Sequence, residues 1–119
     1  MSELDAQMQE WEQRATQAQA RGAHAFARLL AIAEYEQSGQ AYVVAWFLTS
    51  LDDSTVLLDP FALRAVEVGV SDDMLACLDT LRWAKANLCD LVPNGHTRLR
   101  QLVDHWSLSP RRDTRLFDL

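Results

Sequence analysis

The amino-acid sequence predicts an all-α protein, a compact bundle of about five or six helices. The chain has 119 residues, the size of one domain, and 49% of them are hydrophobic, so it can bury one core without metal or disulfide cross-links. Apolar residues recur at the three- and four-residue spacing that is typical of helices. The stretch Gln40 to Leu51 is apolar on nearly every side of a helical wheel, so we expect it to be the central helix of the bundle.

The charge balance is acidic, with a formal net charge of -6 and a pI near 4.9. This balance argues against direct nucleic-acid binding, because the release of counterions from a nucleic acid needs a dense basic surface. No stretch approaches the roughly 20 apolar residues of a membrane span, and the first residues lack the basic-then-apolar order of a signal peptide. We therefore expect a cytoplasmic protein that binds neither nucleic acid nor membrane.

Residues 2–20 are rich in Glu, Gln and Ala, and their apolar residues form one narrow stripe on a helix. The stripe alternates steps of four and three residues and comprises Leu4, Met8, Trp11, Ala15 and Ala18. A coiled coil is one interpretation, but Ala and Gly at the seam positions favour a helix docked on its own domain. Since the spacing continues past Gly22, residues 2–36 form either two helices or one long helix bent at this glycine.

For the domain organisation, we expect one helical domain over residues 1–106. Residues 1–20 are a candidate for a projecting N-terminal helix. The tail, residues 107–119, has no helical period and is expected to be irregular. Two apolar residues near its end, Leu116 and Phe117, are candidates for docking the tail on the domain.

A turn-forming cluster follows the central helix at residues 52–55. Its two consecutive aspartates invite a metal-site interpretation, but consecutive side chains diverge on any regular element, and no calcium-loop spacing follows. A solvated loop is therefore expected. Asp59 and Pro60 then predict a helix start, because aspartate caps a helix and proline at the first helical position loses no hydrogen bond. This short helix is expected over residues 61–66.

The next helix is predicted over residues 71–84. Ser71 is expected to cap it, with the two following aspartates in the first turn, where the helix dipole favours carboxylates. Asp79 and Arg82, three residues apart, are expected to pair on the outer face. The predicted inward face comprises Met74, Leu75, Cys77, Leu78 and Leu81.

The last third of the chain is predicted to hold one helical turn and one helix. The helical turn is expected at residues 88–91, within a connector. Pro93, Asn94 and Gly95 mark a turn, and the last helix follows over residues 96–106. Its predicted inward face comprises Leu99, Leu102, Val103 and Trp106.

No metal site and no cofactor are expected from the spacing of the cysteines and histidines. Cys77 and Cys89 each lack a CxxC or CxxH partner, so both are interpreted as reduced core residues. His96 and His105 are nine residues apart and lie on roughly opposite sides of the last helix, so they cannot share a metal ion.

Four runs within residues 38–106 together resemble a family of small bacterial proteins classed only as a domain of unknown function. The runs are SGQAYVVAWFLTSLDD, DPFALRAV, SDDMLACLDTLRWA and PNGHTRLRQLVDHW. The family pattern has an FDL-like segment where this sequence has FAL at residues 61–63. The resemblance implies a protein carried on plasmids and other mobile elements. Because its motifs are mainly packing and capping residues, it implies a fold and not an activity.

The first function hypothesis is a non-enzymatic protein-interaction module. In size and charge the chain is similar to mobile-element inhibitors of host defence complexes, such as anti-CRISPR proteins. Its partner would then be a basic nucleic-acid-binding protein or a ribonucleoprotein complex. The candidate partner-binding residues are Asp52, Asp53, Asp59, Asp72, Asp73, Asp79 and Trp83.

The alternative hypothesis is a structural or oligomerising protein, a homodimer formed through residues 2–20. An enzyme is not expected, because the sequence has no nucleophile elbow, HExxH motif or glycine-rich phosphate loop.

Overall fold

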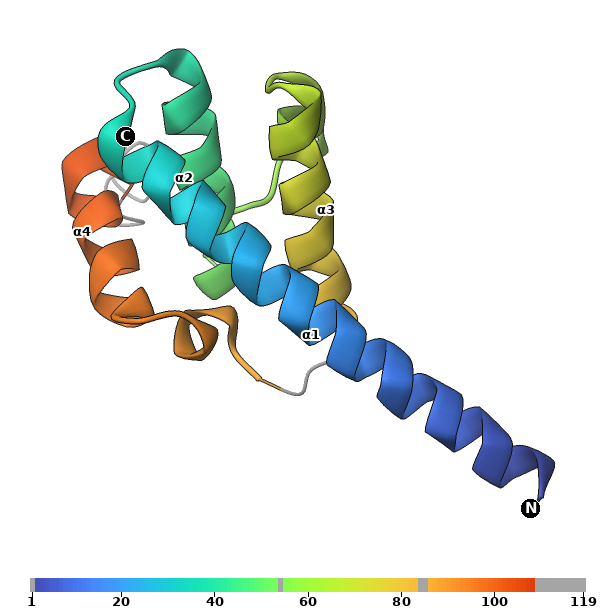
Figure 1. Ribbon diagram of the computed structural model, residues 1–119. Helices are drawn as coiled ribbons and strands as arrows, with labels where there is room; N and C mark the ends of the chain where they lie inside the picture. The colour runs from blue at the N-terminus through green and yellow to red at the C-terminus, as the bar shows by residue number, and fades with distance from the viewer. Residues whose placement is uncertain (1, 54, 84–85, 109–119) are drawn as a thin grey trace.

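The structure is a computed structural model that describes residues 2–53, 55–83 and 86–108 (Figure 1). Within these ranges the chain forms four α-helices and two 3-10 helices, with no β-strand. The helices are α1 (Glu3–Tyr35), α2 (Gly39–Asp52), η1 (Pro60–Arg64), α3 (Val68–Trp83), η2 (Leu88–Leu91) and α4 (Gly95–Trp106). The all-α prediction is confirmed. The predicted count was wrong, because the first two segments are one α-helix and the helix expected after Pro60 is a single 3-10 segment.

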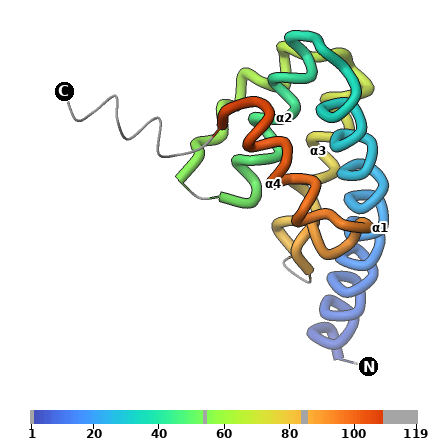
Figure 2. Tube along the Cα trace, turned by 90° about the vertical axis from the view of Figure 1, so that its left-hand side faces the viewer, coloured from blue at the N-terminus to red at the C-terminus, as the bar shows by residue number. Residues whose placement is uncertain are grey.

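The longest helix, α1, organises the bundle. It packs mainly on α3 and also contacts α2, α4 and η2. Figure 2 shows α1 running along one side of the other helices. The predicted helix at residues 40–51 is confirmed as α2, in which Val44, Phe47 and Leu48 are fully buried. The most extensive contacts are nevertheless those of α1, which packs on α2, α3 and α4.

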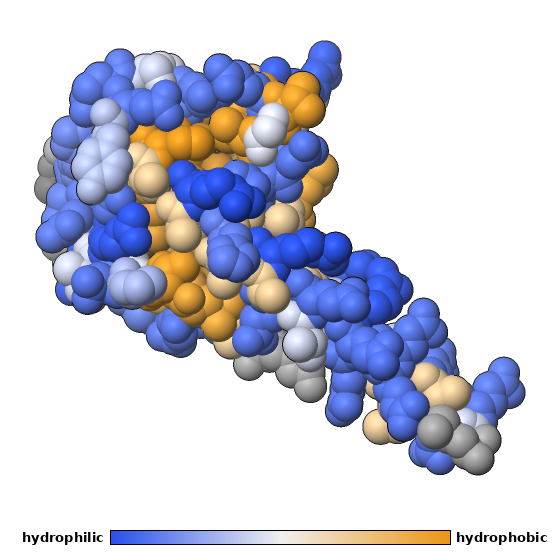
Figure 3. Space-filling model, in the orientation of Figure 1, coloured by the Kyte–Doolittle hydropathy of each residue, from blue (hydrophilic) through white to orange (hydrophobic). Residues whose placement is uncertain are grey.

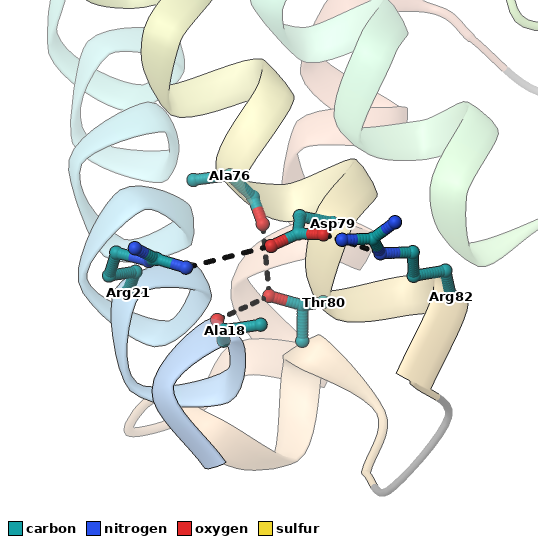
Figure 4. Close-up of polar contacts among 6 residues, drawn as sticks. All are labelled: Ala18, Arg21, Ala76, Asp79, Thr80 and Arg82. Carbon is teal, nitrogen blue, oxygen red and sulfur yellow. Dashed lines mark hydrogen bonds and ion pairs between the residues drawn. The ribbon is translucent and has the colours of Figure 1, made fainter. Parts of the chain in front are cut away.

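Gly22 brings α1 close to α3. A Cβ atom on this residue would overlap the hydroxyl group of Thr80 and lie 2.9 Å from Thr80 Cβ. Thr80 Oγ1 is 2.8 Å from the carbonyl oxygen of Ala18 on α1 and 3.0 Å from that of Ala76 on α3, so one hydroxyl proton is shared between two helices (Figure 4). The absence of a side chain at Gly22 therefore lets α1 pack closely on α3, while α1 itself continues as one helix.

The start of α3 differs from the prediction. The helix begins at Val68, and Ser71 is not its cap, because the Ser71 hydroxyl donates to the carbonyl oxygen of Val68 at 2.8 Å inside the helix. Leu75 and Leu81, both predicted to face inward, are 51% and 37% exposed. The reason is that only a narrow face of α3 contacts the other helices. The buried residues of this face are Val70, Met74, Cys77 and Thr80.

A half-buried ion pair joins α4 to α1. Arg98 donates two hydrogen bonds to the Glu34 carboxylate, with N–O distances of 2.9 and 2.6 Å. The hydrogen bonds from Arg98 raise the pKa of its guanidinium group, because they favour the charged form. Trp106 Nε1 also donates to the carbonyl oxygen of Ala33 at 3.1 Å, so α4 is attached to the end of α1 by two polar contacts.

We expect Arg98→Gln to lower the free energy of unfolding by about 1–2 kcal/mol, because it removes two charge-assisted hydrogen bonds from a shielded carboxylate. The side chains of this pair are only 26% and 20% exposed. A matched control is Arg21→Gln, since Arg21 is 67% exposed and 3.7 Å from Asp79. The control should cost less than about 0.5 kcal/mol. Equal costs in urea denaturation would contradict the structural role of the Arg98 pair.

The first turns of α1 extend beyond the bundle (Figure 1). The molecule measures 60 × 32 × 28 Å along its principal axes, and residues 2–14 are all exposed. The predicted docking of Leu116 and Phe117 lies outside the described residues. Among the helices that the structure describes, none is both long enough and apolar enough to cross a membrane.

Candidate functional site

The six aspartates that the sequence suggested as a binding surface fall into two groups on different elements. The first group lies between the end of α2 and the start of η1: Asp52, Asp53 and Asp59. The second lies on α3: Asp72, Asp73 and Asp79. Five of the six carboxylates have a partner within the part of the protein that the structure describes, and Asp52 has the weakest of these contacts, with the Cys89 thiol at 3.9 Å.

Asp53 and Asp59 shape the loop after α2. Asp53 Oδ1 accepts hydrogen bonds from the backbone N–H of Thr55 at 2.9 Å and from the Thr55 hydroxyl at 2.7 Å. These bonds lower the pKa of the Asp53 carboxyl, because they favour its charged form. Asp59 accepts from the backbone N–H of Phe61 at 3.0 Å, which confirms the predicted cap. Both carboxylates therefore have a local structural role, which is to hold the backbone of this loop.

Asp73 and Asp79 are paired with arginines. Arg28 on α1 donates to Asp73 with distances of 3.0 and 2.8 Å. Asp79 lies 2.7 Å from Arg82, which confirms the predicted pair, and 3.7 Å from Arg21 on α1 (Figure 4). The charge of these carboxylates is thus largely balanced where α3 meets α1. Neither of the two remaining aspartates, Asp52 and Asp72, is paired with an arginine among the described residues, and both are exposed.

Trp83, the aromatic candidate, is half-buried at the end of α3. The guanidinium carbons of Arg14 and Arg82 lie 5.3 and 4.8 Å from its ring, within the range of cation–π attraction. Its buried Nε1 has no hydrogen-bond partner among the described residues. Trp83 therefore closes the end of the α1–α3 contact.

Beyond Trp83 the apolar stripe of α1 continues without cover. Leu4, Met8 and Trp11, which we call the N-terminal stripe, are 62%, 51% and 49% exposed. The next two residues of the stripe, Ala15 and Ala18, are only 2% and 1% exposed. The stripe is therefore buried by the protein's own core from Ala15 onward and open to solvent before it. Figure 3 shows the projecting part of α1 as mainly hydrophilic, with a few apolar side chains towards its end.

The projecting part of α1 is also acidic. Residues 3–14 contain four carboxylates and one arginine, a net charge of -3. The single arginine, Arg14, lies over the ring of Trp83 at the edge of the bundle. Glu3 and Asp5 lie in the first turn, where the helix dipole stabilises carboxylates. The result is an amphipathic helix with a narrow apolar stripe and an acidic surround.

A second feature lies where the end of α2 meets η2 and the start of α4. One ligand atom each of Asp52, Cys89 and His96 lies within 4.8 Å of the other two. Burial, together with the nearby charges of Asp52 and Asp90, raises the pKa of the Cys89 thiol to about 12. Sequence reasoning missed this cluster because it searched for ligands a few residues apart, whereas Asp52 precedes Cys89 by 37 residues.

An apolar pocket of about 340 Å³ lies between α2 and η1. Its lining residues are Tyr42, Val43, Trp46, Asp59, Phe61, Ala62 and Ala65. Trp46 Nε1 donates to the carbonyl oxygen of Leu57 at 3.0 Å, which holds the loop after α2 beside this pocket. The pocket has no converging set of titratable groups, so it gives no indication of catalysis.

These features define a small all-helical protein whose first helix extends beyond its bundle. The chain belongs to DUF7673, a family of unknown function, which matches residues 23–107. No curated protein and no solved structure matches the chain. The predicted resemblance to a family of unknown function is thereby confirmed. The match covers most of the bundle and does not include Leu4, Met8 and Trp11.

Proposed function

We propose that this protein is a non-enzymatic interaction module that binds another protein through the projecting part of α1. The observation that carries the proposal is the N-terminal stripe, in which three large apolar side chains are 49–62% exposed on a helix that extends beyond its own core. Exposed apolar groups in such a row are typical of helices that bind in a groove of a partner. The anchors at Leu4, Met8 and Trp11 follow the four- and three-residue steps of that binding mode.

The charge of the helix specifies the kind of groove. Residues 3–14 carry a net charge of -3, so an apolar groove with a basic rim on the partner would complement both the stripe and its surround. If two copies of this helix paired through their apolar stripes, the acidic side chains that flank each stripe would face one another and repel. Charge therefore favours a different, basic partner over the homodimer that the sequence suggested as the alternative.

We expect Met8→Ser/Trp11→Ser to weaken the complex about 100-fold, because exposed tryptophan and methionine anchors carry much of the binding energy of such interfaces. The protein would serve as bait in a lysate of the cells that produce it, at low and at high salt. Each captured protein would then be purified and its affinity for the bait measured by calorimetry. Binding to a basic rim should also weaken as salt rises.

The matched control is Gln13→Ser/Gln17→Ser, because these exposed residues lie on the opposite face of the same helix. The control should bind like the wild type, and all three proteins should have the same thermal midpoint. A complex that survives loss of the anchors would overturn the proposal. Light scattering gives the other decisive result: we expect a monomer of 13.5 kDa, and twice that mass would favour the homodimer.

A mobile-element inhibitor of a host defence complex, with an anti-CRISPR-like action through acidic residues of the bundle, is the second candidate. The charge balance favours it, since residues 52–90 contain eight carboxylates and three cations. This candidate predicts the opposite pattern in the same experiment. Binding would survive Met8→Ser/Trp11→Ser and fall in Asp59→Asn/Asp72→Asn, a pair that keeps the cap because asparagine caps helices as well as aspartate.

A further inference from the structure

We infer that Asp52, Cys89 and His96 form a binding site for a zinc ion. The three residues belong to three separate elements: Asp52 is the last residue of α2, Cys89 lies in η2 and His96 lies in the first turn of α4. The site is independent of the proposed protein-binding surface, because none of the three residues lies on α1.

The distances suit a small cation. Asp52 Oδ1 is 3.9 Å from Cys89 Sγ, and the three ligand atoms lie within 4.8 Å of one another. Ligands on a tetrahedral zinc ion at bond lengths of 2.0–2.3 Å are about 3.3–3.8 Å apart. Side-chain adjustments of about 1 Å would therefore complete the coordination, and Asp52 and His96 are both exposed enough to make them.

The backbone around the site fixes the least mobile ligand. Asn87 Oδ1 accepts a hydrogen bond from the backbone N–H of Cys89 at 2.9 Å and so caps η2. Gly95 packs directly on the Cys89 backbone, since a Cβ there would lie 2.9 Å from Cys89 Cα. Cys89 is itself only 3% exposed, so its sulfur is held in place by the fold.

Asp90 orients the histidine. His96 Nε2 and Asp90 Oδ1 are 2.7 Å apart. When Nε2 donates to this carboxylate, the other ring nitrogen, Nδ1, carries the lone pair that a metal ion needs. A carboxylate that holds the second nitrogen of a histidine is the usual outer partner of a zinc ligand, and it also strengthens the ligand.

The donor set selects the metal. One sulfur, one imidazole nitrogen and one carboxylate oxygen suit zinc better than calcium or magnesium, which prefer oxygen alone. The end of α2 adds negative potential from its helix dipole, and Asp53 and Asp90 add charge nearby, so a divalent cation would be favoured there. Binding replaces the thiol proton of Cys89, which passes to solvent.

Three protein ligands leave a fourth position open. A pocket of about 180 Å³ lies beside the site, and its lining includes Asp52, His96 and Arg100. We assign the fourth position to a water molecule in this pocket. The ion would tie the end of α2 to η2 and to α4, in addition to the hydrogen bonds and packing through which these segments already meet.

The test is titration of the chelator-treated full chain with Co²⁺, which reports zinc sites by colour. We expect binding of one ion per chain and a thiolate-to-cobalt charge-transfer band, with both lost when Zn²⁺ is added in excess. Cys89→Ser should abolish the band, and His96→Ala should weaken affinity at least about 100-fold because it removes one of three protein ligands. Asp90→Asn should weaken it by about 10–100-fold.

The matched controls are Cys77→Ala and His24→Ala, which alter the other buried cysteine and an exposed histidine. Both should keep the band and the affinity. Circular dichroism checks that each variant is folded. If Cys89→Ser does not fold, His96→Ala provides the test of the site. The His96 side chain is 52% exposed, so its removal leaves the core intact. Absence of cobalt binding by the wild type, or binding unchanged by His96→Ala, would overturn the site.

Discussion

Gly95→Ala is expected to lower the free energy of unfolding by about 3 kcal/mol, the upper end of the usual cost of overpacking. A Cβ on this residue would overlap the carbonyl oxygen of Cys89 and lie 2.8 Å from the carbonyl carbon. These are backbone atoms, so no side-chain rotation relieves the clash. Instead η2 has to move away from the start of α4. For a chain of this size the thermal midpoint should fall by about 10 °C.

The matched control is Gly69→Ala. Gly69 is an exposed residue of α3, and a Cβ there would have no atom within 4 Å. Alanine is the better helix former, so this variant should be unchanged or more stable by up to about 1 kcal/mol. Thermal and urea unfolding experiments would compare the free energies of unfolding of the two variants directly. Similar stabilities would show that η2 and α4 do not approach each other as closely as the structure has them.

Gly22→Ala is expected to destabilise the protein by up to about 2 kcal/mol. The new methyl group would collide with Thr80, at a cost of about 1–3 kcal/mol, while the higher helix propensity of alanine returns about 1 kcal/mol. The Thr80 hydroxyl cannot turn away freely, because it hydrogen-bonds the carbonyl oxygens of Ala18 and Ala76. Relief of the clash therefore requires α1 and α3 to separate slightly.

A double-mutant cycle isolates this contact. Thr80→Ala alone should cost about 1 kcal/mol through the lost hydrogen bond. In Gly22→Ala/Thr80→Ala the clash with the hydroxyl is gone, so the combined cost should be smaller than the sum by about 1 kcal/mol. The pair Gly69→Ala and Thr80→Ala, about 16 Å apart along α3, should be additive. Additivity of the first pair would contradict the close packing at Gly22.

The sequence by itself determined the fold class and the position of several elements. The apolar run at residues 40–51 became α2, the turn before Gly95 leads into α4, and Asp59 caps the segment that starts at Pro60. Each of these features depends on residues within one or two turns of one another. Local periodicity, capping and turn chemistry are therefore sufficient to predict them.

The same local reasoning left the path of the chain at Gly22 undecided and was wrong about the start of α3. A helix-breaking residue at position 22 is tolerated because burial against α3 compensates for its low propensity. Ser71 is a residue type that commonly caps helices, but α3 begins at Val68 and already buries Val70 before Ser71. In both places a contact with another element outweighs the local preference, and no pattern within a single segment reveals that contact.

Only the tertiary structure decided which parts of the chain are available for function. The apolar stripe of α1 has the same spacing throughout, and it is exposed at Leu4, Met8 and Trp11 because Trp83, at the end of α3, is the last cover. Likewise Asp52, Cys89 and His96 have no motif spacing, and they meet because three elements end at the same place. Proximity between distant residues follows from helix packing, which depends on the whole core.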